Sequence, residues 1–242
     1  MSACYVIASW GGRRRKQDNS KAASDGAFYL RAHVGRLASL CKNIDRIIVA
    51  APKCPSPIRG YEEYLRELEA QGKAGTTPIE VFRRPNIGLA YGSYNDVYGR
   101  YRTRFDYYFV AEDDYIPALP GFDGILLERM KKSPKCGFLC GLNWMRGSRV
   151  HAGIFLGVLR AAALEKIWLR QGCLAQFTGS EYLEAEEVGQ VGISWAVVDS
   201  GYEVLDWTQH YSSPFWYNGV VKIFGDPKLP PLYVLGQTFK SS

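Results

Sequence analysis

The sequence lacks the features that place a protein in a membrane or direct it out of the cell. No apolar stretch in its 242 residues approaches the roughly 20 residues that a membrane-spanning helix needs. The N-terminus, MSACYVIASW, shows no basic segment followed by an apolar segment and a cleavage site, so we expect no signal peptide. These absences favour a cytoplasmic protein that could be peripheral to a membrane.

The cysteines form no disulfide framework, and a chain of this size needs none. They stand at positions 4, 41, 54, 136, 140 and 173. Cys136 and Cys140 fall in a predicted strand, where four residues span roughly 13 Å, too far for both thiols to bind one metal. Because there is no His/Cys cluster either, we expect no zinc site and interpret the cysteines as reduced, buried thiols.

Nothing in the sequence divides the chain into separate domains. It contains no internal repeat, low-complexity tract or Ser/Gly-rich linker, and its length allows a large core. The composition is that of a soluble globular protein. A net charge of +6 favours anionic ligands without identifying one. We therefore expect a single domain over residues 1–242.

Apolar segments and turn signals predict an α/β fold, a mostly parallel central sheet flanked by helices. The first 115 residues alternate between the two kinds of element, as in a doubly wound sheet. Strands are expected at about 4–9, 45–51, 79–82 and 105–112, and helices at about 25–41, 57–71 and 94–101. The second part is less regular, with helices near 122–132, 161–169 and 188–199, strands near 136–142, 154–159 and 202–207, a loop at 144–153 and an extended tail from 227.

The fourth predicted strand ends in three carboxylates. Residues 107–111 are all apolar, as in a central parallel strand, and Glu112, Asp113 and Asp114 follow directly. Ligands of open α/β sheets bind outside the carboxyl ends of the strands, and three carboxylates there repel one another unless a cation or proton is present. In an extended chain Glu112 and Asp114 share a side and Asp113 points away. The pattern suits one hard metal ion; the alternative is a polar turn.

Two further segments accompany this acidic strand end: RRPNIGLAYGSYN at 83–95 and SEYLEAEEVGQVGISWAVVDSGYEV at 180–204. In order and spacing the three resemble motifs of GT-A fold glycosyltransferases, especially the large inverting family 2. That family has a D-x-D-type motif after its fourth strand, an Asn-x-Gly-x-Ala…Asn loop, and a late acidic residue followed by Trp and a Gly-aromatic turn. The matching positions are Glu112-Asp113-Asp114, Asn86-Ile87-Gly88-Leu89-Ala90 with Asn95, and Glu186-Glu187 with Trp195 and Gly201-Tyr202. The resemblance covers residues 4–207.

The resemblance implies a glycosyltransferase that moves a sugar from a nucleotide-diphosphate-sugar donor to a hydroxyl of a glycan or other acceptor. It implies inversion by direct displacement, a nucleotide-sugar-binding half at about 1–115 and an acceptor-binding half at about 116–242. Asp114 would be the main metal ligand, with Glu112 or Asp113 on the ribose or a metal-bound water, and His210 a further ligand of metal or diphosphate. Carboxylate oxygens suit Mg²⁺ or Mn²⁺, which would neutralise charge on the leaving diphosphate.

Sugar transfer also needs a base that removes the proton of the acceptor hydroxyl. Glu187 is the first choice and Glu186 the second. The distance from this pair to Trp195 is two or three residues longer than in the family, so the register is open. Glu181 and Glu184 stay open. The alternative is a solvated helix start, where Glu is favourable against the helix dipole.

Residues expected to contact the nucleotide lie after the first and third strands. They are Ser9, Trp10, Arg84, Asn86, Gly88 and Asn95. Arg83 and Arg84 could instead be solvated charges, and Gly88 could simply make a turn. Where the family carries an Asp that reads the base, this chain has Ala50-Ala51-Pro52-Lys53, so base recognition would fall to Ser9, Trp10 or Asn86. For the acceptor sugar, the candidates are Trp144, His151 and Trp216, whereas His33 is interpreted as structural.

Two alternatives concern the loop SWGGRRRKQDNSK at 9–21. It resembles the Gly-Gly…Arg…Lys signature of sugar-phosphate nucleotidyltransferases, although the Gly-Thr/Ser-Arg step and the Pro-Lys pair of that signature are missing. The basic run at 13–16 could also bind nucleic acid or an anionic membrane, with Tyr and Trp as stacking partners. Four basic residues are a weak footprint, so no nucleic-acid partner is expected.

Overall fold

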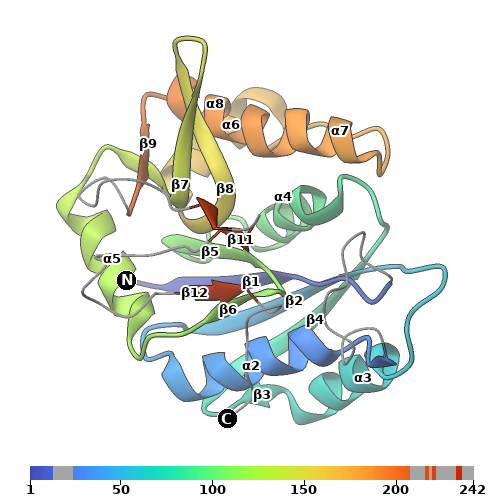
Figure 1. The fold of residues 1–242 in the computed structure, drawn as a ribbon. Coiled ribbons are helices and arrows are strands. Elements are labelled where there is room, and N and C mark those ends of the chain that lie inside the picture. Colours follow the sequence, from blue (N-terminus) through green and yellow to red (C-terminus); the bar gives the residue numbers. More distant parts are fainter. Residues whose placement is uncertain (13–23, 208–215, 218–219, 222–232, 236–242) are drawn as a thin grey trace.

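The fold is given by a computed structural model that describes residues 1–12, 24–207, 216–217, 220–221 and 233–235 (Figure 1). Its first part alternates strands and helices, as the sequence predicts. The elements are β1 (Ala3–Ala8), α2 (Phe28–Leu40), β2 (Arg46–Pro52), α3 (Tyr61–Gln71), β3 (Lys73–Ala74), β4 (Thr77–Arg84), α4 (Leu89–Tyr101) and β5 (Tyr107–Glu112).

The second part begins with a short strand and a helix, and its centre is a long hairpin. The elements are β6 (Tyr115–Pro117), α5 (Phe122–Lys132), β7 (Cys136–Arg146), β8 (Arg149–Arg160), α6 (Ala161–Gln171), α7 (Tyr182–Glu184), the π-helix η1 (Ala185–Val191), α8 (Gly192–Asp199), β9 (Glu203–Asp206), β10 (Trp216–Tyr217), β11 (Val220–Val221) and β12 (Tyr233–Leu235). Of the predicted extended tail, β12 pairs with β6.

One sheet contains strands from both parts, in the order β3-β4-β2-β1-β5-β8-β7-β9. β1 pairs in parallel with β2 and with β5, and β2 pairs in parallel with β4. β8 runs antiparallel to both β5 and β7, and β9 is parallel to β7. The predicted fold class, a mostly parallel α/β sheet flanked by helices, is confirmed.

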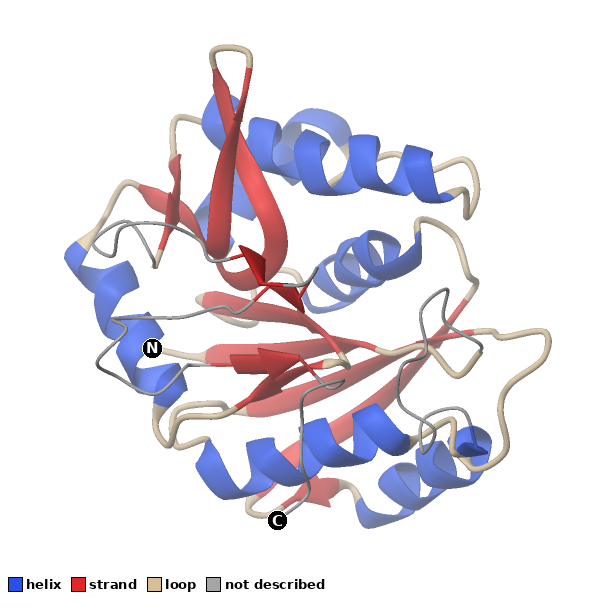
Figure 2. Cartoon of the chain, in the orientation of Figure 1, coloured by secondary structure: helices blue, strands red, loops and turns tan. Residues whose placement is uncertain are grey.

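Helices cover both faces of this sheet and create two hydrophobic cores (Figure 2). On one face, α2, α3 and α5 bury side chains against Tyr5, Ile7 and Phe109. On the other, α4, α6 and α8 pack against Val6 and Val110. Successive residues of a strand point to opposite faces, so a strand buried on both faces must be apolar throughout. This is why the central strands read as unbroken apolar runs.

The predicted loop at 144–153 is wrong. β7 and β8 continue through it as one hairpin, in which Trp144 pairs with His151 and Arg146 with Arg149. The turn is made possible by Gly147, which has a φ of 62°, a left-handed conformation that glycine adopts without strain. The polar residues of this segment suggested a loop because the hairpin extends beyond the sheet, where its side chains are largely exposed.

The predictions about membrane-spanning helices and about the cysteines can be compared with the described residues. Within them, no helix has the length and apolar character needed to cross a membrane. All six cysteines are free, and Cys4, Cys136 and Cys140 are buried as predicted, but the other three are only partly so. The thiols of Cys41, Cys54 and Cys173 are therefore less protected than the sequence suggested.

We expect Phe109→Ala to destabilise the fold strongly. Phe109 is fully buried on β5, stacks on Tyr5 with ring centroids 5.7 Å apart, and meets the edge of Phe122 at 6.3 Å. Removing such a ring leaves a cavity and should lower the free energy of unfolding by about 3–5 kcal/mol, measured by urea denaturation. The control Leu169→Ala removes an exposed side chain and should change it by less than about 0.5 kcal/mol. Equal effects of the two would contradict this assignment of the core.

Candidate functional site

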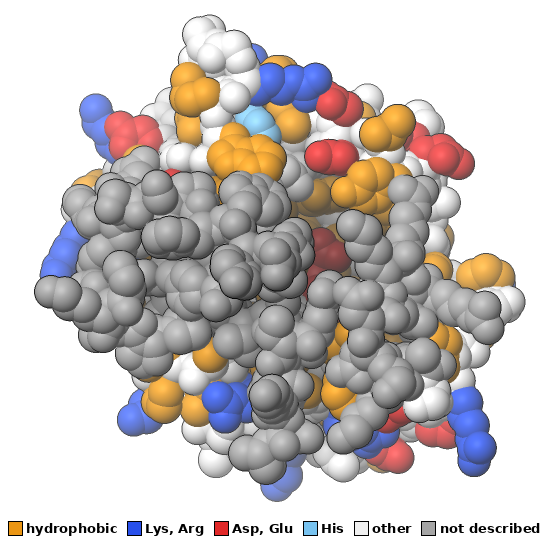
Figure 3. Space-filling model, in the orientation of Figure 1, with side chains coloured by type: hydrophobic (Ala, Val, Ile, Leu, Met, Phe, Trp, Pro, Cys, Tyr) orange, Lys and Arg blue, Asp and Glu red, His pale blue; other side chains and the backbone are white. Residues whose placement is uncertain are grey.

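The predicted site segments meet at the carboxyl edge of the parallel strands. Ala8 at the end of β1 is in register with Glu112 at the end of β5 and with Ala50 in β2. Pro52 in turn lies beside Arg84, which ends β4. The residues after β1, β4 and β5 therefore leave the sheet along the same edge. On the face shown in Figure 3, an acidic side chain lies recessed near the centre of the molecule, close to hydrophobic side chains.

Asp113, in the turn after β5, ties the ends of β1 and β5 together. It is 1% exposed; its amide donates to the Ala8 carbonyl at 3.1 Å, and its Oδ2 accepts the Trp10 amide at 3.2 Å. Its carbonyl lies 3.2 Å from Nδ1 of His33, whose Nε2 is 3.0 Å from the Tyr5 hydroxyl. Asp113 thus has a structural role, since its carboxylate holds the backbone of Trp10. His33 also has the structural role predicted for it.

Glu112 and Asp114 flank Asp113 in the chain, and both are half-buried. Burial, followed by repulsion from the Glu112 and Asp114 carboxylates, raises the pKa of Tyr115 in β6 well above its usual value. Both flanking carboxylates are therefore near enough to Tyr115 to disfavour its ionisation.

Sequence reasoning missed the tyrosines around these carboxylates. Tyr91 and Tyr94 project from α4, and burial, followed by repulsion from Glu112, raises the pKa of each hydroxyl well above its usual value. Tyr91 and Tyr94 thus place two neutral hydroxyls on the face of the sheet to which Glu112 points. The available signal was the spacing of Tyr91 and Tyr94, three residues apart on a helix that directly follows the Asn-Gly loop.

The late acidic cluster is carried by the π-helix η1, a rare element that is frequent at functional sites. Glu187, the first choice for the base, has a 55% exposed side chain, and both of its oxygens lie 2.6 Å from Nη1 of Arg146 on the β7–β8 hairpin. Glu186 is half-buried and lies close enough to Tyr91 to affect its pKa. The two glutamates therefore differ in surroundings: Glu187 is exposed and ion-paired, and Glu186 is half-buried near Tyr91.

The other two candidate bases are placed less favourably. Glu184 accepts hydrogen bonds of 2.7 Å from both the amide and the hydroxyl of Thr178, which lower the pKa of its carboxyl. Glu181 is exposed at the start of α7. A stabilised carboxylate is a weaker proton acceptor, so neither position competes with Glu186.

Contacts between α4 and η1 hold Glu186 in place. The Tyr91 hydroxyl donates to Oε1 of Gln190 at 2.7 Å, and Nε2 of Gln190 donates to the Gly153 carbonyl of β8 at 3.1 Å. The Tyr91 ring packs against Gly189 so closely that a Cβ there would overlap it. α4, η1 and the hairpin thus form one hydrogen-bonded unit beside the end of β5.

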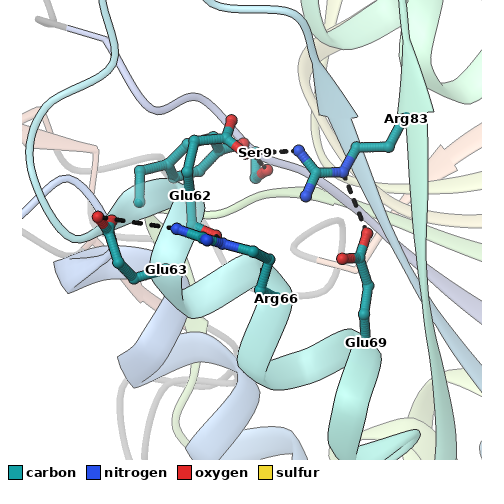
Figure 4. Close-up of polar contacts among 7 residues, drawn as sticks. Ser9, Glu62, Glu63, Arg66, Glu69 and Arg83 are labelled. Carbon is teal, nitrogen blue, oxygen red and sulfur yellow. Dashed lines mark hydrogen bonds and ion pairs between the residues drawn. The ribbon is translucent and has the colours of Figure 1, made fainter.

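Two residues predicted as possible nucleotide contacts bond within the scaffold. The Ser9 hydroxyl is 2.6 Å from that of Tyr61, and Arg83 forms ion pairs with Glu62 and Glu69 of α3 at 2.6 and 3.1 Å (Figure 4). Ser9 is buried, and Arg83 is an exposed charge, one of the two possibilities left open for it.

The residues around the loop before α4 likewise contact other parts of the protein. Arg84, with a 2% exposed side chain, pairs with Asp96 at 2.7 Å and donates to the Ile87 carbonyl at 2.5 Å. Gly88 has a φ of 71°, and a Cβ on it would overlap the ring of Phe177. Asn95 accepts the Leu174 amide at 2.8 Å. These three residues shape the loop.

The two remaining residues predicted to contact the nucleotide are Trp10 and Asn86. Trp10 is partly exposed after β1, and its backbone amide donates to Asp113. The Oδ1 atom of Asn86 is buried and has no hydrogen-bond partner among the described residues. His210, residues 13–16 and the side chain of Trp216 lie outside what the structure describes.

The described residues contain no group of three or more His, Cys, Asp or Glu side chains arranged to hold a metal ion. A magnesium site needs less from the protein when a diphosphate is present, since one or two carboxylates suffice and phosphate and water oxygens complete the shell. Glu112 and Asp114 are hard oxygen donors on one side of the turn. They fit such an ion and do not fit zinc.

Comparisons with known proteins give little beyond this geometry. No protein-family model matches the chain, and no curated protein matches it. Among solved structures, the chain aligns with the one titled as CMP:2-keto-3-deoxy-manno-octonic acid synthetase complexed with CTP. The alignment has 14% identity and a TM-score of 0.49, and covers 85% of this chain and 89% of that one. At this identity and TM-score the alignment does not indicate a function, so the function has to be inferred from the residues of the site.

The buried imidazole of His33 predicts a stability that depends on pH. Burial lowers its pKa from 6.5 to about 4, so the folded state binds this proton less readily than the unfolded state. The contribution is complete above pH 6.5 and is lost as the pH falls toward 4, by about 3 kcal/mol in the free energy of unfolding. Urea denaturation at pH 4 to 7.5 should show this loss in the wild type and a smaller one in His33→Gln. Parallel pH profiles for the two proteins would contradict it.

Proposed function

We propose that this chain is a glycosyltransferase that moves a sugar from a nucleotide-diphosphate-sugar donor to a hydroxyl of a glycan or other acceptor. One observation carries the proposal: Glu112 and Asp114 follow the carboxyl end of β5, and a hydrogen bond from Tyr91 to Gln190 joins α4 to η1, the element that carries Glu186. Carboxylates on both sides of a ligand crevice can serve a diphosphate-bound cation on one side and an acceptor hydroxyl on the other.

On the donor side, Asp114 would hold Mg²⁺ or Mn²⁺, with Glu112 as the second protein ligand. When bound, such an ion acts as a Lewis acid and neutralises the charge of the departing diphosphate. Trp10 and the Oδ1 atom of Asn86 are the described groups best placed for the nucleotide, because the other predicted contacts are committed to the scaffold. The neutral hydroxyls of Tyr94 and Tyr115 line the same side without adding charge.

On the acceptor side, Glu186 would take the proton of the attacking hydroxyl. The acceptor oxygen forms a bond to the anomeric carbon as the bond from that carbon to the phosphate oxygen breaks. The bonding electrons leave with the nucleoside diphosphate. Attack opposite the leaving group inverts the anomeric centre, as the family resemblance implies. Trp144 and His151, paired across the β7–β8 hairpin, are the proposed contacts for an acceptor sugar.

A sugar-phosphate nucleotidyltransferase remains the second candidate, because it would use the same edge of the sheet. Its hallmark would be a glycine loop whose backbone wraps a triphosphate. Here Gly11 is buried, its carbonyl accepts the Ile58 amide at 2.7 Å, and a Cβ on it would overlap the Tyr61 ring. Packing against α3 thus accounts for Gly11, and the first proposal is preferred. Pyrophosphate release from a nucleoside triphosphate and a sugar 1-phosphate would reverse that preference.

We expect Asp114→Ala to abolish metal-dependent donor binding. A thermal-shift screen of UDP- and GDP-sugars, with and without Mn²⁺, should find a donor that stabilises the wild type only with the metal. At a donor concentration of 100 times Kd the gain is about 2.7 kcal/mol, and Asp114→Ala should lose it. The control Asp199→Ala removes an exposed carboxylate of α8 and should keep it. Metal-dependent stabilisation of Asp114→Ala would show that the acidic strand end is only a turn.

The two adjacent glutamates are expected to differ sharply in turnover. Glu186→Gln should lower kcat by about 10²- to 10⁴-fold, the usual contribution of a general base, with donor binding retained. Glu187→Gln breaks an exposed ion pair with Arg146 and should cost less than about tenfold. Steady-state kinetics with the donor found above measure both. The reverse order would return the base to Glu187.

A further inference from the structure

The hydroxyl of Tyr94 is a buried polar group that the fold leaves without a hydrogen bond. Tyr94 is 3% exposed, and its Oη has no partner among the described residues. Other tyrosines of the same layer are satisfied: the Tyr98 hydroxyl donates to Glu165 at 3.0 Å, and that of Tyr108 to the Tyr101 carbonyl at 2.6 Å. A buried hydroxyl without a partner loses its hydrogen bonds to water and gains none in the protein, which costs free energy. A bound ligand that hydrogen-bonds to it would offset that cost.

The ring of Tyr94 is fixed beside the acidic strand end. It stacks on Phe155 with centroids 5.5 Å apart and planes 14° apart, and meets Tyr91 edge-on at 6.5 Å. Val110 of β5 packs in the same hydrophobic core as Tyr94 and Phe155, and Glu112, two residues further along β5, points to the same face of the sheet. Tyr94 therefore lies on the face of the sheet to which Glu112 points.

The surroundings of this hydroxyl suit a neutral partner. Burial and the nearby Glu112 keep it protonated at neutral pH, so it can both donate and accept a hydrogen bond. Its neighbours are the rings of Tyr91 and Phe155, which supply apolar surface and no positive charge. A diphosphate needs cationic or backbone donors, whereas a sugar offers hydroxyl groups and apolar C–H faces.

We propose that the Tyr94 hydroxyl hydrogen-bonds a hydroxyl group of the transferred sugar and so determines which donor the enzyme accepts. This inference rests on the proposed function, because it assigns the crevice at Glu112 to a nucleotide-sugar. A site built to pair with a substrate hydroxyl rejects the analogue that lacks it, since the protein group would then stay buried and unpaired. Tyr94 is a specificity-determining residue, distinct from the carboxylates that would hold the metal and take the proton.

The test compares Tyr94→Phe with Tyr98→Phe, a matched change one turn later on α4 that removes a hydroxyl bonded to Glu165. Without ligand, Tyr94→Phe should keep or raise the Tm, because it removes an unpaired buried group, whereas Tyr98→Phe should lower it. Titration calorimetry with Mn²⁺ then uses UDP-glucose, UDP-galactose, UDP-N-acetylglucosamine and GDP-mannose, and the matching nucleoside diphosphate. Tyr94→Phe should weaken binding of the nucleotide-sugar by about tenfold and leave that of the diphosphate unchanged.

Three results would overturn the proposal. A Tm of Tyr94→Phe reduced as much as that of Tyr98→Phe would mean that the protein itself satisfies the hydroxyl. Unchanged affinity for the nucleotide-sugar would remove the contact, and equal weakening for nucleotide-sugar and diphosphate would move it to the nucleotide. If the wild type binds none of the four donors, the proposed function fails together with this inference; if it binds one and Tyr94→Phe binds equally well, only this inference fails.

Discussion

Asp113 links the ends of the two central strands, and the placement of the flanking carboxylates depends on that link. Its amide bonds to Ala8, its carboxylate receives the Trp10 amide, and its carbonyl faces His33. A carboxylate with 1% exposure is tolerated only when such hydrogen bonds replace its hydration. Because Asp113 is buried and Glu112 and Asp114 are only half-buried, the flanking carboxylates are the ones that remain accessible to a ligand.

The tyrosines near Glu112 are neutral, and this matters for what can bind there. Tyr91, Tyr94 and Tyr115 stay protonated because burial and the nearby carboxylates oppose their ionisation. Such side chains offer hydroxyls and rings without adding charge. Gln190 joins Tyr91 of α4 to Gly153 of β8, which fixes η1 beside α4.

How much could be predicted differs between the fold and the site. The strands β1, β2 and β5 were predicted within about two residues, because burial on both faces demands unbroken apolar runs. The β7–β8 hairpin was not, because it projects from the sheet and its polar residues imitate a loop. The roles of Ser9, Arg84 and Asn95 could not be separated from ligand binding by sequence, since their partners Tyr61, Asp96 and Leu174 depend on how α3 and α4 pack.

The sequence by itself determined the alternation of strands and helices and the acidic end of β5, because periodicity and local composition are written along the chain. It also limited the candidates for a base to a few neighbouring glutamates. Only the tertiary structure showed that Glu186 and Glu187 have different surroundings, since the partner of Glu187, Arg146, stands 41 residues away. It alone showed that the Tyr94 hydroxyl has no hydrogen-bond partner among the described residues, because that depends on how α4 packs against β8.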